Sequence, residues 1–471
     1  MKVMTRFAAL ALLAALGPAN AALYGLDPGF STAGRYNASI VGSDFRLLAH
    51  LQRPNGTSVA VAFYDGDICP AGRHCLALLP FNAAGAMTGA LLVPTNGQAT
   101  FSKRSGGGIF DPVMIKAADI DSQGRIVVVG SEQFGTAIDF KVVRLLSNGQ
   151  PDNTFGSNGV QTIDFNAGGA NQDFAYGVSI DPYDKVVVVG EVQRSATDTD
   201  FGIARLNVDG SLDPSFMGTG KRTIPFDLSP SNSDQAVAVK ATTTTIYIAG
   251  NASDNGVGRL AFAQLLSSGS YRSGFCPGAC TYQGTYPSIN SGRRVIYFGN
   301  QSDTSDILVS ASVNLSTRKW VYAGTRLGPS PTFTNEMFVQ TLDANGDYVN
   351  EGLRDGGFAA PYHVGGVRWV DETNATSSIV LTGVSGDLLF FAQGMDSDLV
   401  ATPNWGGASP DSSYFIYDQG SNPGHLPAQP AIDSAGRVLL GGSYRAGDTN
   451  AYSIHVARIA PTENIFRNGF E

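Results

Sequence analysis

The chain has 471 residues, of which 43% are hydrophobic and 15% charged, with 57 glycines and 23 prolines. It carries 31 basic and 40 acidic residues, a formal net charge of −9 at pH 7. A net negative chain with interspersed charges lacks the positive surface that phosphate backbones and anionic lipids need, which excludes nucleic acid as a partner. The density of glycine, proline and β-branched residues also excludes long amphipathic helices. We therefore expect an all-β protein.

The N-terminus carries the pattern of a secretory signal peptide. Lys2 and Arg6 precede an apolar run, and an Ala-Asn-Ala site ends at Ala21. The run is much shorter than the roughly 20 apolar residues that span a bilayer, which disfavours the alternative of an uncleaved anchor. We expect cleavage after Ala21, export to the periplasm or the exterior, and no membrane span. Loss of Lys2 and Arg6 would leave 29 basic and 40 acidic residues, a net charge of −11.

Three β-branched runs, each ending in glycine, recur at a fixed interval. IVVVG ends at Gly130, VVVVG at Gly190 and IYIAG at Gly250, so the glycines are 60 residues apart. SVAVAFYDG fills the same slot upstream, and weaker copies downstream end at Gly324, Gly383 and Gly441. A period of this size marks one supersecondary unit copied along the chain. Seven units can be recognised.

Each unit has the pattern of four short antiparallel strands. The first carries small residues such as Ala175 and Gly177, which suit a strand near a crowded axis, and the second is the apolar run, which suits a strand buried on both faces. The third leads through an Asn- or Asp-Gly turn, where positive φ is needed. The fourth is expected over LDPSF to TIPF, ending at Phe226.

The two ends of the chain favour a closed ring over an open solenoid. LDPGF (Leu26 to Phe30) has the fourth-strand signature, whereas the last copy stops after its third strand, Tyr452 to Pro461. Each end supplies what the other lacks, and closure removes exposed strand edges. We predict a β-propeller of seven four-stranded blades closed by the N-terminal strand, with six or eight blades as alternatives. The predicted organisation is a signal peptide over residues 1–21, the propeller over 22–461 and a C-terminal tail over 462–471.

The third and fourth copies resemble the delta-60 repeat of bacterial secreted proteins, with the pattern D-F-x-x-A-R-L-x-x-D-G-S-L-D-x-S-F. The matching residues are Asp200, Phe201, Ala204, Arg205, Leu206, Asp209, Gly210, Ser211, Leu212, Asp213, Ser215 and Phe216. The resemblance is specific over Asp111 to Phe275. It implies a β-propeller and carries no catalytic or ligand motif.

The four cysteines form two close pairs, Cys69 with Cys75 and Cys276 with Cys280. An even count in an oxidising compartment favours two local disulfides. His74 raises the alternative of a metal site, but its ligands would have to converge from units about 200 residues apart. We predict the two disulfides.

One string has the spacing of a calcium loop. Asp343, Asn345, Asp347 and Glu351 fall at positions 1, 3, 5 and 9, which lets oxygen ligands wrap a hard cation. The string resembles the calcium loops of integrin-type propellers but has Tyr348 where a glycine would permit the sharp turn. It also occupies the slot of the ordinary turn between third and fourth strands. We favour the plain turn and no cofactor, with calcium as the alternative.

Aromatic residues gather in the late units. Trp369, Trp405, Tyr414 and Tyr417 could stack on sugars or anchor a protein partner, and packing between blades explains them equally well. No serine-hydrolase elbow, zinc-protease motif or phosphate-binding glycine loop occurs. The favoured function is an exported, non-catalytic, monomeric propeller that binds a surface glycan or protein. The alternative is a hydrolase or lyase with carboxylates from several blades in the central channel.

Overall fold

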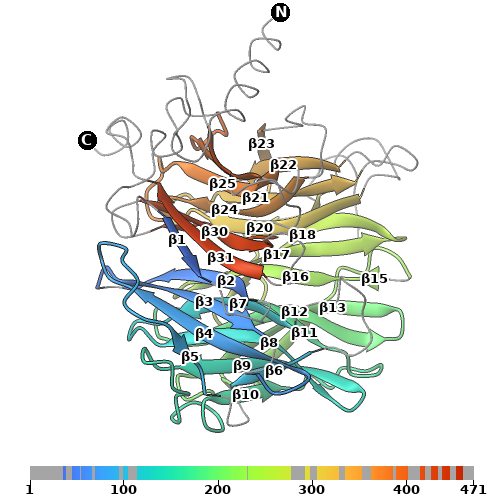
Figure 1. Cartoon of the computed structure of the whole chain (residues 1–471). Helices are drawn as coiled ribbons and strands as arrows, with labels where there is room; N and C mark the ends of the chain where they lie inside the picture. The colour runs from blue at the N-terminus through green and yellow to red at the C-terminus, as the bar shows by residue number, and fades with distance from the viewer. Residues whose placement is uncertain are drawn as a thin grey trace, which may run out of the picture.

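In a computed structural model the chain forms seven sheets arranged as a β-propeller (Figure 1). The structure describes residues 35–38, 45–53, 55–65, 69–94, 99–103, 114–230, 232–276, 292–296, 305–327, 335–352, 362–385, 389–400, 414–418, 426–432, 437–445 and 452–459. This part of the chain contains no helix, and so none that could cross a membrane. The prediction of an all-β, seven-bladed propeller is confirmed.

The first four blades follow one another along the chain. The first contains β2 (Phe45–Gln52), β3 (Ser58–Tyr64), β4 (Arg73–Phe81), β5 (Leu91–Leu92) and β6 (Thr100–Ser102). The second contains β7 (Ile115–Ile120), β8 (Ile126–Phe134), β9 (Ala137–Leu145) and β10 (Val160–Ile163). The third contains β11 (Phe174–Ile180), β12 (Val186–Ser195), β13 (Asp198–Leu206), β14 (Lys221–Ile224) and β15 (Asn232–Ser233). The fourth contains β16 (Gln235–Ala241), β17 (Thr245–Asp254), β18 (Val257–Leu266) and β19 (Arg293–Ile296).

The remaining blades complete the ring. The fifth contains β20 (Ser305–Val313), β21 (Trp320–Leu327), β22 (Asn335–Leu342) and β23 (Tyr348–Gly352). The sixth contains β24 (Tyr362–Trp369), β25 (Ile379–Ser385), β26 (Leu389–Met395) and β27 (Tyr414–Asp418). The seventh contains β28 (Leu426–Pro427), β29 (Ala431–Ile432), β30 (Val438–Arg445), β31 (Tyr452–Ile459) and β1 (Arg35–Ala38).

The N-terminal strand closes the ring, as predicted. β1 pairs antiparallel with β31, from Arg35 opposite Ala457 to Ala38 opposite Ile454 (Figure 1). The predicted closing segment, Leu26 to Phe30, lies outside the described residues, and the strand itself begins five residues after Phe30. The third blade has the same spacing from the end of its LDPSF signature to β14, so the signature belongs to the turn and the strand follows it.

The turn before the fourth strand explains the resemblance motif. In the third blade Arg205 Nε donates to Asp213 Oδ2 at 2.7 Å, and the guanidinium lies 5.2 Å from the centre of the Phe216 ring. Its Nη1 donates to the backbone oxygen of Ser267 in the next blade. Arg144 repeats these contacts one blade earlier with Asp152, Phe155 and the Val208 carbonyl. The motif therefore holds successive blades together, which is a structural role.

Hydrophobic side chains fill the space between blades. Each of seven buried clusters joins two neighbouring blades, such as the one that packs Val129 of β8 against Val188 of β12. Burying one such valine side chain contributes roughly 1.5 kcal/mol or more. The repeat glycine is required by sterics, because a Cβ at Gly190 would overlap the carbonyl oxygen of Phe174 on the innermost strand. Gly130, Gly250 and Gly324 face the same obstacle in their own blades.

Candidate functional site

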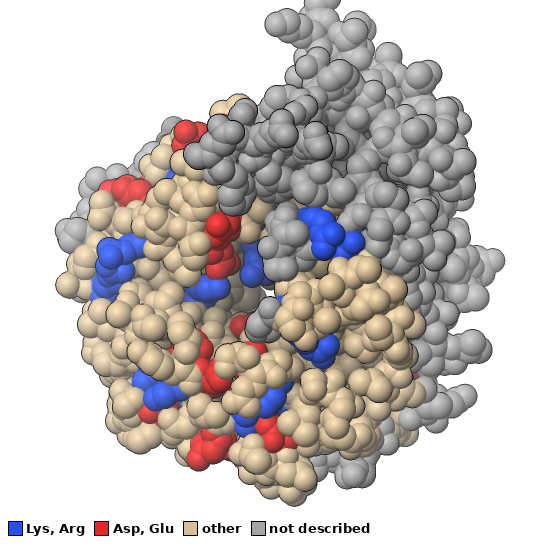
Figure 2. All heavy atoms as spheres, turned by 90° about the vertical axis from the view of Figure 1, so that its left-hand side faces the viewer, with Lys and Arg blue, Asp and Glu red and all other residues tan. Residues whose placement is uncertain are grey.

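The innermost strands of the blades surround the axis of the ring, where neighbouring ones contact each other. Figure 2 shows a hollow at the centre of one face, with acidic and basic side chains around it. Opposite the repeat-glycine region, six described innermost strands carry a one-residue bulge: Leu48, Lys116, Tyr176, Val237, Val309 and Gly365. Four of these residues are aliphatic or glycine. Lys116 and Tyr176, in adjacent blades, are the departures from that pattern.

The residue just after the repeat glycine is also exceptional in the third blade, close to Lys116 and Tyr176. In the last unit the strand pairing puts Gly442, one residue after the expected Gly441, in the position of the repeat glycine. In three blades a short polar side chain just after this glycine accepts an amide of the next innermost strand, at 2.7–3.1 Å: Ser131, Asn251 and Ser443. The third blade has Glu191 instead. Its carboxylate accepts a hydrogen bond from Tyr176 and lies 3.3 Å from Gln235 Nε2. Lys116 lies 5.5 Å from the centre of the Tyr176 ring.

Glu191 is the titratable group of this cluster with the most altered proton affinity. Burial raises its pKa to about 7, although Tyr176, Gln235 and Lys116 all act to lower it. Burial likewise lowers the pKa of Lys116, against the attraction of Glu191. A carboxyl that is partly protonated near neutral pH can donate or accept a proton. The sequence signal for it was its deviation from Ser131 and Asn251, which the sequence reasoning did not use.

A pocket of about 600 Å³ opens at the other end of the innermost strands, among turns of four neighbouring blades. It is lined by Ile120, Asp121, Ser122, Ile180, Asp181, Pro182, Asp184, Lys240, Ala241, Thr242, Thr243, Thr244, Thr245, Tyr247, Arg272, Leu315 and Arg318. Its volume is typical of sites that hold small molecules. Its lining is unusually rich in hydroxyls and charges.

Several charged side chains of the pocket already form hydrogen bonds or ion pairs within the protein. Asp121 Oδ2 accepts a hydrogen bond from Arg125 Nε at 2.5 Å, and Asp184 accepts two from Ser122, at 2.7 and 3.0 Å. Within the described residues, the Arg272 guanidinium makes one weak hydrogen bond, at 3.5 Å, to the Thr245 hydroxyl. The exposed hydroxyls of the turn between β16 and β17 and the two arginines at 272 and 318 are therefore what the pocket offers to a ligand.

An ion pair crosses the ring beside the pocket. Lys240 on β16 of the fourth blade pairs with Glu372, which follows β24 of the sixth blade and also lies 3.7 Å from Arg368 Nε. Burial acts to raise the pKa of Glu372, but Lys240 and Arg368 hold it below its ordinary value. Lys240 itself lines the pocket, so the pair holds one of the pocket's charged side chains in place.

The predicted calcium string lies in the hairpin between β22 and β23. Asp343 Oδ1 accepts the amides of Asn345 and Asp347 at 2.8 and 2.9 Å, the contacts of a turn-forming aspartate. Glu351 lies within β23, opposite Gln340 of β22. These placements match the plain turn that the sequence favoured, and calcium binding there stays a question for experiment.

The first predicted disulfide is present. Cys69 and Cys75 are bonded, with their Cα atoms 5.9 Å apart. Cys276 is also disulfide-bonded, while its predicted partner Cys280 lies outside the described residues.

Trp369 does not form an exposed binding surface. It is 1% exposed and packs in the cluster between the fifth and sixth blades, with Val321 and Ile379 among its neighbours. Its prediction as a stacking residue is therefore corrected to the core-packing alternative, because an amphipathic ring at a blade interface gains more from burial. Tyr414 and Tyr417 lie on β27, and Trp405 lies outside the described residues.

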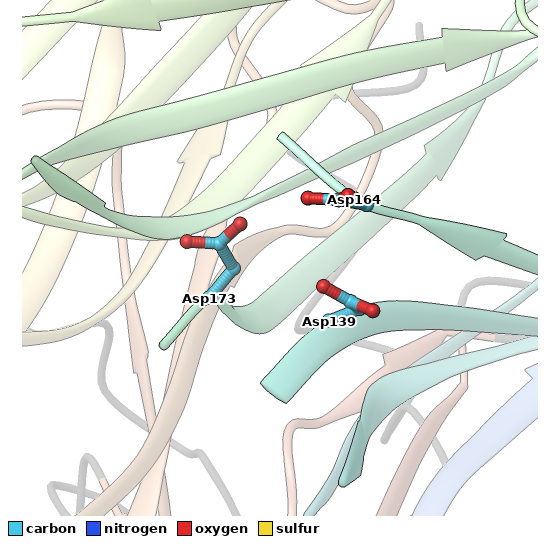
Figure 3. A group of neighbouring side chains, drawn as sticks. All are labelled: Asp139, Asp164 and Asp173. Carbon is cyan, nitrogen blue, oxygen red and sulfur yellow. The ribbon is translucent and has the colours of Figure 1, made fainter. Parts of the chain in front are cut away.

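The arrangement that sequence reasoning missed is acidic. Three carboxylates meet where the second blade joins the third, those of Asp139, Asp164 and Asp173, and Figure 3 shows them converging on one space. A second group lies one blade on and comprises Asp198, Asp200 and Asp227. Matching the units position by position identifies Asp139 with Asp200, but the other two carboxylates of each group come from positions that are not equivalent and give no repeated signal.

Comparison with known proteins supports the fold. The sequence model of a domain of unknown function (DUF5122) beta-propeller matches residues 122–155 and 184–216. These segments hold the apolar second strands and the turn motifs of the second and third blades. A search of curated proteins finds no relative of this sequence.

The solved structures that match this chain are distant in sequence. The α-L-arabinofuranosidase Arb93A of Fusarium graminearum is 11% identical, with a TM-score of 0.41 over 90% of this chain and 97% of that one. The β-propeller domain of the Trilobed protease of Pyrococcus furiosus, described as having an open velcro topology, is 9% identical, with a TM-score of 0.39 over 85% and 89%. Similarity at this level says nothing about activity.

Proposed function

We propose that this protein is an exported, non-catalytic propeller that binds a surface glycan in the pocket at the end of its channel. The observation that carries the proposal is the polar pocket of about 600 Å³ among the turns of four blades. The predicted signal peptide over residues 1–21 and the Cys69–Cys75 disulfide support an oxidising compartment outside the cytoplasm. The ring over residues 22–461 would act as one monomeric domain.

The chemistry of the pocket suits sugar hydroxyls. Thr243 and Thr244 present exposed hydroxyls that both donate and accept hydrogen bonds. Arg272 and Arg318 add donors, and Asp184 adds an acceptor whose position Ser122 holds. A concave site with many short polar groups complements a glycan better than the flat apolar core of a protein interface.

The test measures binding by the mature full chain to an array of bacterial surface polysaccharides, followed by calorimetry on any hit. Thr243→Tyr should fill the pocket and reduce the affinity at least tenfold, without changing the melting temperature. Gln123→Tyr is the matched control, since Gln123 is exposed in the equivalent turn of the second blade but does not line the pocket. Equal binding by both variants, or capture of proteins with no glycan bound, would overturn the proposal.

One observation favours the rival function, an enzyme working in the channel. Glu191 combines burial, a pKa raised to about 7 and a neighbouring lysine, which is a setting suited to general acid catalysis. Under the proposed binding function, wild-type protein and Glu191→Gln should both leave polysaccharides uncleaved. Release of reducing ends or unsaturated products by wild type, lost in Glu191→Gln and retained in Ser131→Ala, would establish the enzyme instead.

A further inference from the structure

The charged side chains that line the pocket are divided between the blades that supply them. The second and third blades supply only carboxylates, those of Asp121, Asp181 and Asp184. The fourth and fifth blades supply only cations, those of Lys240, Arg272 and Arg318. The pocket therefore has an acidic side and a basic side, and the charges that the protein leaves unpaired decide which ligand fits.

The carboxylates on the acidic side are already bonded. Asp181 Oδ1 accepts the backbone amides of Tyr183 and Lys185 at 2.8 and 3.0 Å, which shapes the turn between the first and second strands. Asp121 does the same in the second blade. Asp184 accepts two hydrogen bonds from the turn of the second blade. These carboxylates are therefore accounted for by the bonds that they make within the protein.

The corresponding turns of the fourth and fifth blades are built without a carboxylate. Thr242 and Asn314 take the place of Asp181, since the backbone amide of each donates to the carbonyl at the far end of the same turn. The Thr242 hydroxyl accepts the Thr245 amide at 3.0 Å. Asn314 Oδ1 accepts the Thr317 amide, also at 3.0 Å. Neutral side chains thus form the same turn, so this side of the pocket lacks the negative charge while it keeps the structure.

Arg272 reverses the charge of a motif position. Its backbone amide donates to the Gln264 carbonyl at 2.9 Å, just as the amide of Asp213 donates to the carbonyl of Arg205 at 2.9 Å one blade earlier. In the third blade, Asp213 Oδ2 accepts hydrogen bonds from Arg205 Nε and Lys185 Nζ, both at 2.7 Å. The fourth blade therefore has a guanidinium where the third has a carboxylate that pairs with two cations.

The Arg272 guanidinium has no counterion among the described residues. Gln264 replaces the motif arginine, and its enclosed side-chain amide makes no hydrogen bond there. Thr245 replaces Lys185 and makes only the weak hydrogen bond at 3.5 Å. A guanidinium carries five N–H donors, so most of the donors of Arg272 remain available to a ligand in the pocket.

Arg318 reverses the charge at a second position. It takes the place of Asp184, since each directly precedes the lysine that leads into the second strand, and both have left-handed backbone, with φ of 59° and 60°. Such a backbone favours glycine, which the second blade has at Gly124. The Arg318 guanidinium is exposed at the pocket and forms no hydrogen bond or ion pair with the rest of the described chain. The turn therefore does not account for an arginine here.

We infer that the glycan held by this pocket is acidic and that its negatively charged group binds Arg272 and Arg318. The planar guanidinium matches two oxygens of a carboxylate, and equally those of a sulfate or a phosphate. Lys240 is already paired with Glu372, so the two arginines carry the contact. The exposed threonine hydroxyls between β16 and β17 then bond to hydroxyls of the sugar. The inference rests on the proposed binding function and specifies the class of sugar.

Binding of an anion by this protein requires local cations. Without residues 1–21 the chain has 29 basic and 40 acidic residues, a net charge of −11, so its overall field repels an anion. A preference for acidic glycans would therefore arise from particular side chains and not from the average charge of the surface.

The experiment compares acidic polysaccharides with their own neutral forms, using the mature full chain. An array carries uronate, sulfated and phosphorylated glycans, each beside a counterpart whose carboxyl is reduced to an alcohol or whose sulfate or phosphate is removed. Calorimetry with oligomers of each hit should give at least about tenfold tighter binding of the acidic form, the size expected of one charge-assisted hydrogen bond. That preference should shrink as the salt concentration is raised from about 0.05 M to about 0.5 M.

Variants that remove one charge assign the preference to the pocket. Arg272→Gln and Arg318→Gln should each weaken binding of the acidic form at least about tenfold and leave binding of the neutral form nearly unchanged. Arg194→Gln is the matched control, because Arg194 is exposed and does not line the pocket. The comparison of the two glycan forms on wild-type protein does not depend on the folding of any variant.

The outcomes separate this inference from the proposed function. Equal binding of acidic and neutral forms, or an equal loss of affinity in Arg194→Gln, would overturn the inference and leave glycan binding in place. Failure of every polysaccharide to bind, whether acidic or neutral, would overturn both.

Discussion

The junction between the fourth and fifth blades has the same backbone pairing as the two acidic junctions but the opposite balance of charge. Asp306 stands where Asp173 and Asp234 stand, since Leu308 pairs with Gly324 as Ala175 pairs with Gly190. Arg259, however, stands where the earlier junctions have Asp139 and Asp200. Arg326 Nε also donates to Asp306 Oδ1 at 2.7 Å. Here the chain supplies its own cations.

The difference separates two roles of the carboxylates. The aspartate before the innermost strand holds backbone amides in place, as Asp173 does by accepting the Gln193 amide at 3.0 Å. The repeat keeps an aspartate at this position in all three junctions. The second carboxylate is not needed for the fold, because Arg259 replaces it without disturbing the strand pairing. The excess of carboxylates at the two earlier junctions is therefore not required for the strand pairing of the blades.

The largest effect should come from opening the ring on which every junction depends. Deletion of residues 22–40 removes β1 and exposes the edge of β31, so we expect aggregation or loss of the cooperative transition. Size-exclusion chromatography with light scattering, together with calorimetry, measures both. Deletion of the tail, residues 462–471, is the control and should change neither. A monomer lacking 22–40 that melted with the intact protein would show that the ring closes some other way.

A smaller effect should distinguish the balanced junction from the acidic ones. Arg326→Met leaves the fully buried Asp306 without its guanidinium and should cost about 3 kcal/mol of unfolding free energy in urea. The matched change Arg194→Met removes a largely solvent-exposed guanidinium whose Nε lies 3.4 Å from Asp200 Oδ2. It should cost under about 1 kcal/mol of unfolding free energy. Similar losses in both variants would mean that the two junctions do not differ in how they balance charge.

The smallest effect is a pH dependence of the protein's stability. Burial raises the pKa of Asp139, Asp173 and Asp200 to about 6 and that of Asp234 to about 7, from an ordinary 3.8. These carboxyls stabilise the fold while protonated, fully below about pH 4, and that contribution is lost as the pH rises through 6 to 7. Asp200→Asn should therefore gain about 1 kcal/mol of unfolding free energy over wild type at pH 7.5 and less at pH 5.

The comparison between variants is necessary because another buried group titrates in the opposite sense. His50 is held neutral by burial, which lowers its pKa from 6.5 to about 3, so it favours the fold at high pH and destabilises it as the pH falls below 6.5. Urea unfolding of wild type and Asp200→Asn at both pH values cancels its contribution. An equal difference at pH 5 and 7.5 would contradict the raised pKa of Asp200.

The fold could be predicted from local sequence signals because every blade repeats the same pattern of strands and turns. The apolar run ending in Gly190, the turn with Asp213 and the 60-residue period each report on contacts within one unit or with its neighbour. The disulfide of Cys69 with Cys75 was equally local. Two details were misplaced: the fourth strand follows its signature by five residues, and Trp369 lies in the core.

The sites could not be read in the same way, because their members come from different blades. Lys116, Tyr176 and Glu191 belong to neighbouring units and meet at the channel, and Lys240 reaches Glu372 from two blades away. Sequence alone determined the repeat, its strand order and the closure of the ring, since these follow from periodicity and from what each end of the chain lacks. Only the tertiary structure decided which charges face one another, because wrapping the chain into a ring brings together residues whose separation along the sequence carries no signal.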